Sequence, residues 1–178
     1  MPWSLRLALA VGWLWWGVPQ AAEALDRKFE DLSASVEVAP VISFVLDNPH
    51  LAFGLVGPRT TKVLGEGRYY NQVTCRSNSG RSWYLKAQLL SLKQMGGGTS
   101  LDPSGLKWKL VESTGAAGSN PADFQPFASD PVLVYASQGD DTKGQEVVLR
   151  FQYSLTTPLE SQAGNYIGEV LFTMAESP

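Results

Sequence analysis

Residues able to do acid–base, nucleophilic or metal chemistry are few in this chain. His50 is the sole histidine and lies in a turn-forming run that begins at Asp47, which excludes a zinc or copper site built from several histidines. A Ser-His-Asp triad would have to use His50, and no Gly-x-Ser-x-Gly nucleophile elbow accompanies it. No sequence pattern identifies a pair of carboxylates for glycoside hydrolysis. We therefore expect no catalytic residue, no cofactor and no enzymatic activity.

Two short motifs could bind ions, and neither fits its ligand well. The run Gly96–Ser100 lacks the lysine of a phosphate-binding loop, and no helix is predicted after it, so we interpret it as a flexible hairpin tip. Asp140 and Asp141, flanked by Gly139 and Gly144, could offer oxygen atoms to calcium. The regular ligand spacing of a calcium loop is absent, so a solvated acidic turn is favoured and no metal is predicted.

Aromatic side chains on a β-domain can stack on sugars or pack inside. Tyr69, Tyr70, Tyr84 and Tyr135 are candidates for stacking, and cross-strand pairing with core packing is the favoured interpretation. Tyr84 and Trp108 are the two candidate ligand contacts.

Trp108 has a specific prediction of its own. It alternates with Leu106 and Leu110, while Lys107 and Lys109 point the other way. This alternation predicts that Trp108 lies in the core, and the competing hypothesis makes it an exposed wall-binding contact.

Cys75 is the one cysteine and cannot form an internal disulfide. It either packs as a small apolar side chain or pairs with a second chain. Because Val73 and Cys75 share one strand face, burial is predicted. An exported domain without disulfides is then stabilised by its core alone.

The N-terminus has the order of parts of a secretory signal. Arg6 precedes an apolar run from Leu7 to Val18, and the small residues Ala22 and Ala24 follow it. The run is too short for a membrane-spanning helix, which needs about 20 residues. We expect cleavage after Ala24, a signal peptide over 1–24, and a mature chain over 25–178 without a transmembrane anchor. Its expected location is secreted, at the cell surface, or in a periplasm.

The mature chain is weakly acidic and rich in turn formers. Loss of Arg6 and Glu23 with the signal leaves the net charge at −3, which argues against nucleic acid or an anionic membrane surface as partner. The 17 glycines and 11 prolines indicate many turns.

After a helical turn predicted over Leu25–Leu32, apolar residues recur with a period of two. A long loop is expected over 112–131, pinned to the core by Phe124 and Phe127, and a hairpin is expected across Asn78–Gly80. The predicted strands cover residues 35–46, 51–55, 68–76, 82–92, 106–110, 132–135, 145–155 and 166–175. About eight strands without a long helix predict an all-β fold, a single Ig-like antiparallel β-sandwich over 25–178.

The core of that sandwich is predicted from the same alternation. It comprises Val36, Val38, Phe53, Val73, Cys75, Trp83, Leu85, Trp108, Leu110, Leu149, Phe151, Tyr166, Val170 and Phe172.

Three segments carry a family resemblance. The run from Gly164 to Pro178 is similar to the pattern G-x-Y-x-A-x-L-T-W-x-L-x-x-x-P, with Phe172-Thr173-Met174 in place of Trp-x-Leu. A Trp-x-Leu triplet occurs at Trp108-Lys109-Leu110, and N-x-G-x-x-W-x-L is matched by Asn78, Gly80, Trp83 and Leu85. These features resemble the WxL domain of bacterial surface proteins, and the layout is similar to spore-coat-U-like and other secreted fimbrial sandwiches.

The resemblance implies a secreted surface or assembly domain, and WxL domains attach non-covalently to Gram-positive cell walls. The favoured hypothesis is a non-catalytic, cell-wall- or envelope-associated structural or adhesion protein. A fimbrial-type subunit that completes its sheet with a neighbour's strand is one alternative, and a carbohydrate-binding module is the other. The expected partners are cell-envelope polysaccharide or other surface proteins.

Overall fold

The structure, a computed structural model, describes residues 35–117 and 123–177. The chain divides into two compact units, Met1–Glu37 and Val38–Pro178, and every strand of the described residues lies in the second. The strands are β1 (Ile42–Leu46), β2 (Thr61–Leu64), β3 (Asn71–Ser77), β4 (Tyr84–Gln94), β5 (Leu106–Ser113), β6 (Gln125–Pro126), β7 (Val132–Ala136), β8 (Glu146–Thr156) and β9 (Tyr166–Ala175), with short 3-10 turns at Pro103–Gly105 (η1) and Gly139–Thr142 (η2).

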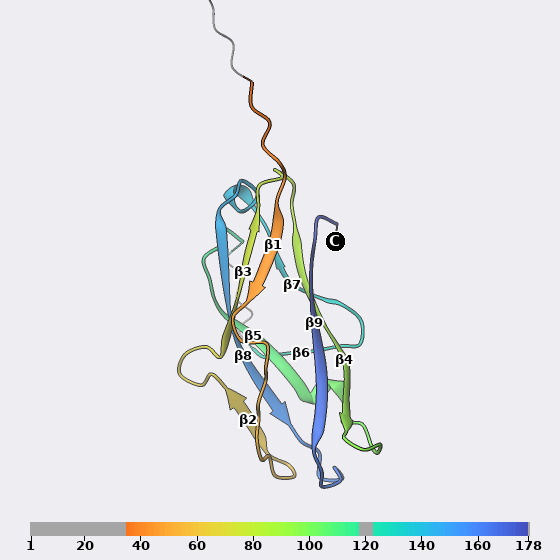
Figure 1. Ribbon diagram of the computed structural model, residues 1–178. Helices are drawn as coiled ribbons and strands as arrows, with labels where there is room; N and C mark the ends of the chain where they lie inside the picture. Colours follow the sequence, from red (N-terminus) through yellow and green to blue (C-terminus); the bar gives the residue numbers. More distant parts are fainter. Residues whose placement is uncertain (1–34, 118–122, 178) are drawn as a thin grey trace, which may run out of the picture. The chain divides into compact units, whose positions relative to one another are not determined.

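Two antiparallel sheets form the fold, which confirms the predicted all-β sandwich. The first sheet has the order β1-β3-β8-β5-β6, and β2 pairs with the end of β8 beyond β3. The second sheet has the order β7-β4-β9 (Figure 1). One edge strand of each sheet, β1 and β9, lies on one side of the sandwich, and β5–β6 lies near β7 on the other.

The core lies between the central strands of the two sheets. In β8 the alternating residues Val147, Leu149 and Phe151 are completely buried, and in β4 Leu85 and Leu89 are at most 1% exposed. Burial is confirmed for the predicted core residues Val73, Cys75, Trp83, Leu85, Trp108, Leu110, Leu149 and Phe151.

Six residues of the predicted core are not buried. Val36 and Val38 are 87% and 74% exposed. Phe53, Tyr166, Val170 and Phe172 are only partly buried. The alternation gives the direction of these side chains correctly, but burial also requires a second layer over them, and sequence alternation does not show whether one is present.

The hairpin predicted across Asn78–Gly80 is wrong, because β3 and β4 belong to different sheets. The connecting residues bind other parts of the chain instead. The Gly80 N–H donates to the Thr142 carbonyl at 3.0 Å, and the Trp83 N–H donates to Ser137 Oγ at 2.7 Å. These hydrogen bonds hold the connection between β3 and β4 as the chain crosses from one sheet to the other.

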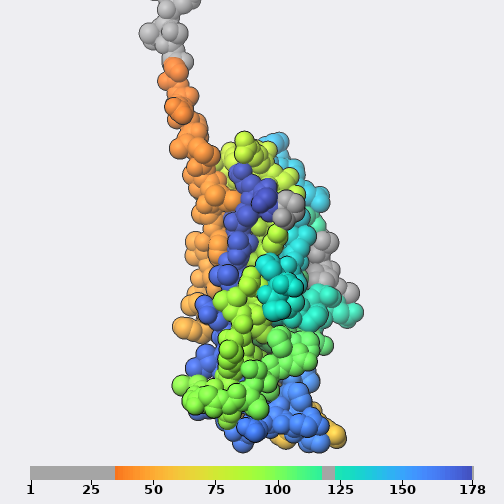
Figure 2. Space-filling model, turned by 90° about the vertical axis from the view of Figure 1, so that its right-hand side faces the viewer, coloured from red at the N-terminus to blue at the C-terminus, as the bar shows by residue number. Residues whose placement is uncertain are grey.

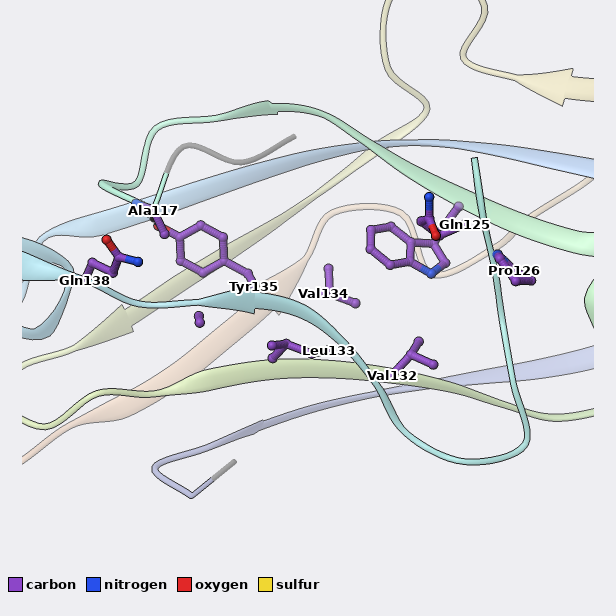
Figure 3. Close-up of a pocket in the computed structure, with 10 residues that line it drawn as sticks. Ala117, Gln125, Pro126, Val132, Leu133, Val134, Tyr135 and Gln138 are labelled. Atoms are coloured by element: carbon purple, nitrogen blue, oxygen red, sulfur yellow. Dashed lines mark hydrogen bonds between the residues drawn. The ribbon is translucent and has the colours of Figure 1, made fainter. Parts of the chain in front are cut away.

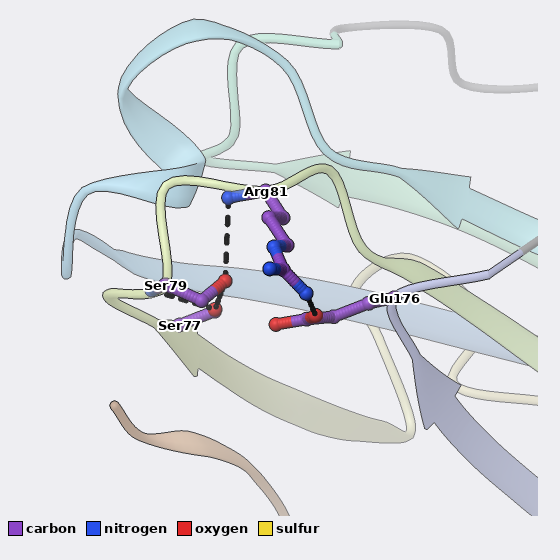
Figure 4. Close-up of polar contacts among 4 residues, drawn as sticks. All are labelled: Ser77, Ser79, Arg81 and Glu176. Atoms are coloured by element: carbon purple, nitrogen blue, oxygen red, sulfur yellow. Dashed lines mark hydrogen bonds and ion pairs between the residues drawn. The ribbon is translucent and has the colours of Figure 1, made fainter. Parts of the chain in front are cut away.

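Side chains along this crossover hold its shape (Figure 4). Ser77 Oγ lies 3.1 Å from Ser79 Oγ, which accepts the Arg81 N–H at 3.3 Å. The Arg81 guanidinium reaches Glu176 at 3.5 Å, just beyond the end of β9.

The predicted loop over 112–131 starts inside β5, which ends at Ser113, and its described part includes the short strand β6, which pairs with β5. Phe127 is 2% exposed, so its predicted role as an anchor to the core is confirmed. Phe124 is partly buried, with Lys109 Nζ 5.9 Å from its ring centre.

Residues 51–55 do not form the predicted strand. Leu51 and Phe53 still pack partly against the core, whereas Leu55 is 96% exposed. The signal peptide and the helical turn at Leu25–Leu32 lie outside the described residues, and the boundary of a single domain at residue 25 stays a prediction. Within residues 35–117 and 123–177, no helix has the length and apolar character required to cross a bilayer.

Candidate functional site

The residues first considered for chemistry do not converge. His50 is exposed, and its carbonyl accepts a hydrogen bond from the Tyr70 hydroxyl at 2.9 Å. Across the described ranges, no three His, Cys, Asp or Glu side chains gather in a way that could hold a metal ion. Tyr84 lies on the outer face of β4, because its neighbour Leu85 faces the core, and Trp108 lies on the inner face of β5 in the other sheet. The two candidate ligand contacts therefore do not form one site.

Cys75 is buried, as predicted. Burial raises the pKa of its thiol to about 12, so the neutral form persists at physiological pH. A buried neutral thiol is poorly placed to react or to pair with a second chain.

The prediction of a solvated acidic turn is wrong for Asp141, which is 1% exposed. Its carboxylate accepts hydrogen bonds from the Ala116 N–H at 3.0 Å, the Gln138 N–H at 3.0 Å and the Tyr135 hydroxyl at 2.7 Å. Three donors replace the water that burial removes, so the residue ties η2 to β7 and to the end of β5. Asp140 is exposed and pairs with Lys143 at 3.0 Å, as a solvated turn residue would.

The side of the sandwich at β1 and β9 is open. Phe44 pairs in register with Cys75, and Ile42 pairs with Ser77. Cross-strand partners share a sheet face, so Ile42 and Phe44 point inward with these fully buried residues. They remain 44% and 37% exposed, although β9 of the second sheet lies beside β1.

The inner face of β9 is similarly uncovered. Val170, Phe172 and Met174 pair in register with Leu89, Ala87 and Leu85 of β4, which face the core, yet the three β9 residues are only partly buried. Among the described strands, β4 alone pairs with β9, so the other edge of this ten-residue strand is free.

Strands β1 and β9 lie next to each other along one side of the sandwich (Figure 1 and Figure 2). We call this side the seam and define it by Ile42, Phe44, Val170, Phe172 and Met174. The described residues cover these five apolar side chains only in part.

The opposite side carries a pocket of 570 Å³ between β5–β6 and β7 (Figure 3). Its polar lining side chains include Gln125 from β6 and Gln138 just after β7, and its apolar walls include Pro126 and Val132. None of the described lining residues carries a charge. Two of the lining residues are candidates from the sequence, Trp108 as a ligand contact and Tyr135 for stacking on sugars. The sequence pattern did not predict that they share a pocket, because β6 is defined by its pairing with β5 and has no periodicity of its own.

Trp108 contributes to the wall of this pocket. It is 5% exposed and its ring packs at 6.2 Å from Phe151, so the prediction that it lies in the core is confirmed. Its indole N–H is buried without a hydrogen-bond partner among the described residues. Such a group is uncommon in folded proteins and costs about 1–3 kcal/mol.

Comparison with known proteins identifies no family. No family model matches the chain, and no curated protein matches it. A solved family 123 glycoside hydrolase from Clostridium perfringens aligns with 68% of this chain at 11% identity and a TM-score of 0.39. The alignment spans 19% of that enzyme's chain, and a likeness at this level carries no argument about activity.

Proposed function

We propose that this chain is an exported, non-catalytic structural domain of the cell surface that joins an envelope-associated assembly by accepting a β-strand into the seam. The observation that supports the proposal is the seam itself, where the inner faces of two neighbouring edge strands are apolar and are only partly covered by the described residues. The resemblance of the sequence to WxL and fimbrial sandwiches supports the surface location.

A strand added beside β9 satisfies two requirements at once. Its backbone pairs with the free edge of β9, and its apolar side chains cover Phe44, Phe172 and Met174. A free, apolar strand edge is an unfavourable surface that native proteins usually cover or break up. Since full burial of a large apolar side chain is worth about 1.5–3 kcal/mol, completing the burial of these residues stabilises the joined state.

The donor we propose is the segment before β1 in a second copy of the chain. Val36 and Val38 continue the period-two spacing that leads to Ile42 and Phe44, and both are exposed. An extended segment with apolar residues at alternate positions is what a strand-accepting groove recognises.

The test is the oligomeric state of the chain from Leu25, measured by light scattering after size-exclusion chromatography over a range of concentrations. We expect self-association that the double variant Val36→Asp/Val38→Asp abolishes. Leu55→Asp is the control, because Leu55 is also an exposed apolar residue and is not one of the residues that define the seam or the proposed donor. A peptide of residues 35–41 should compete with self-association and raise the melting temperature of the double variant.

A chain that stays monomeric at every concentration and is not stabilised by the peptide would contradict strand acceptance. Self-association that survives the double variant, with no peptide effect, would place the contact elsewhere and reject this donor.

A further inference from the structure

We propose that the pocket between β5–β6 and β7 binds a neutral sugar unit, with the Trp108 indole N–H donating a hydrogen bond to a sugar oxygen. The site lies on the opposite side of the sandwich from the seam, so it does not depend on strand acceptance.

The lining chemistry selects a neutral ligand with many hydrogen-bonding groups. The amides of Gln125 and Gln138 each offer donors and an acceptor, which suits hydroxyl groups. The walls at Pro126 and Val132 are apolar and suit the C–H face of a sugar ring. Without a charged side chain among the described lining residues, an anionic or cationic ligand would enter the pocket uncompensated. A volume of 570 Å³ lies within the usual range for small-ligand sites.

The indole N–H supplies the specific contact. The Trp108 ring is 5% exposed and packs near Phe151, with 6.2 Å between the ring centres. Gln125 lies opposite Trp108 in the β5–β6 register, so both residues belong to the same face of the sheet. The Gln125 side chain is exposed, and the proposal requires it to move aside so that a ligand reaches the buried indole N–H. An acceptor oxygen that enters there satisfies a donor that has no partner among the described residues of the free protein.

Trp83 provides an internal comparison, because its indole N–H donates to the Asp141 carbonyl at 3.1 Å and is already satisfied. The chain from Leu25 contains only these two tryptophans, so its amide spectrum has two indole N–H resonances. The variant Trp108→Phe assigns them, because it removes one resonance and keeps an aromatic ring in the core.

The experiment titrates the ¹⁵N-labelled chain with neutral trisaccharides of glucose, mannose and N-acetylglucosamine. Trigalacturonic acid tests charge, and trialanine tests peptide binding. We expect at least one neutral trisaccharide to shift the Trp108 resonance and leave that of Trp83 in place. Gln125→Ala and Gln138→Ala should each weaken this binding at least fivefold, and Trp108→Phe should weaken it at least tenfold.

Gln145→Ala is the matched control, since Gln145 is exposed and is not among the pocket-lining residues, and its affinity should equal that of the parent chain. The proposal would be overturned if no neutral sugar at millimolar concentration shifts the Trp108 resonance, or if trialanine alone shifts it. Stronger binding of the acidic sugar, or sugar binding that the two glutamine variants leave unchanged, would overturn it as well.

Discussion

Strands β8 and β9 have nearly the same sequence pattern and very different surroundings. In β8, Val147, Leu149 and Phe151 occupy alternate positions on the inner face and are completely buried. In β9, Val170 and Phe172 alternate in the same way and are only half-buried. The two strands have similar lengths, so propensity does not explain the difference.

The cause is the position of each strand in its sheet. β8 is central, with β2 and β3 on one edge and β5 on the other, and the core cluster lies over its inner face. β9 is an edge strand, and its inner face is only partly covered on the side next to β1. Alternation therefore shows which way a side chain faces, and the number of neighbouring strands decides how deeply it is buried.

The largest effect expected from this comparison is at Phe151. Phe151→Ala removes a fully buried ring that stacks with Tyr153 and contacts Trp108 and Phe172, so it should lower the free energy of unfolding by about 3–5 kcal/mol. Urea denaturation of the variant and the parent chain measures this difference. A loss below about 1 kcal/mol would mean that the centre of β8 is not the tightly packed part of the core.

Alkaline pH tests whether Tyr135 in β7 is buried as deeply as the β8 residues. Burial, together with the hydrogen bond to the Asp141 carboxylate, raises the pKa of Tyr135 from 10.0 to about 12. Between these values the unfolded chain releases the phenol proton while the folded chain keeps it, so stability is full below pH 10 and falls as the pH rises to 12. Each pKa unit corresponds to about 1.4 kcal/mol, which gives a loss of roughly 2–3 kcal/mol from Tyr135.

Denaturant melts at several pH values measure this loss, and Tyr135→Phe is the control. Cys75 and Tyr153, whose pKa values burial also raises, add to the alkaline loss in both proteins. The slope of stability against pH between 10 and 12 should therefore be shallower in Tyr135→Phe. Equal slopes would show that Tyr135 is accessible to water.

These comparisons separate what local pattern predicts from what it does not. The bounds of β9 match the predicted strand at Tyr166–Ala175, and Trp108 is in the core as its alternation with Leu106 and Leu110 predicts. Both features depend on neighbouring residues in the sequence.

The failures depend on partners far away in the sequence. The turn at Asn78–Gly80 has hairpin residues, but β3 and β4 find their pairing strands elsewhere. Asp141 looks like a surface residue until Tyr135 and the backbone of Ala116 supply its hydrogen bonds. The seam and the pocket are both defined by how strands of the two sheets lie beside one another, and a local sequence pattern does not show this arrangement.

The smallest expected effect concerns Phe172, and it tests the seam most directly. Because this ring is half-buried, Phe172→Ala should lower the free energy of unfolding of the isolated chain by about 1–2 kcal/mol, well below the effect of Phe151→Ala.

The same change should also weaken the effect of the peptide, because a bound strand covers the ring. The readout is the shift in melting temperature that a saturating peptide of residues 35–41 produces in the Val36→Asp/Val38→Asp background. Leu133→Ala is the control, since Leu133 is 53% exposed on β7 at the far edge of the same sheet and should leave the peptide effect unchanged. If Phe172→Ala costs as much as Phe151→Ala in the isolated chain and does not change the peptide effect, then β9 is already covered and the contrast with β8 fails.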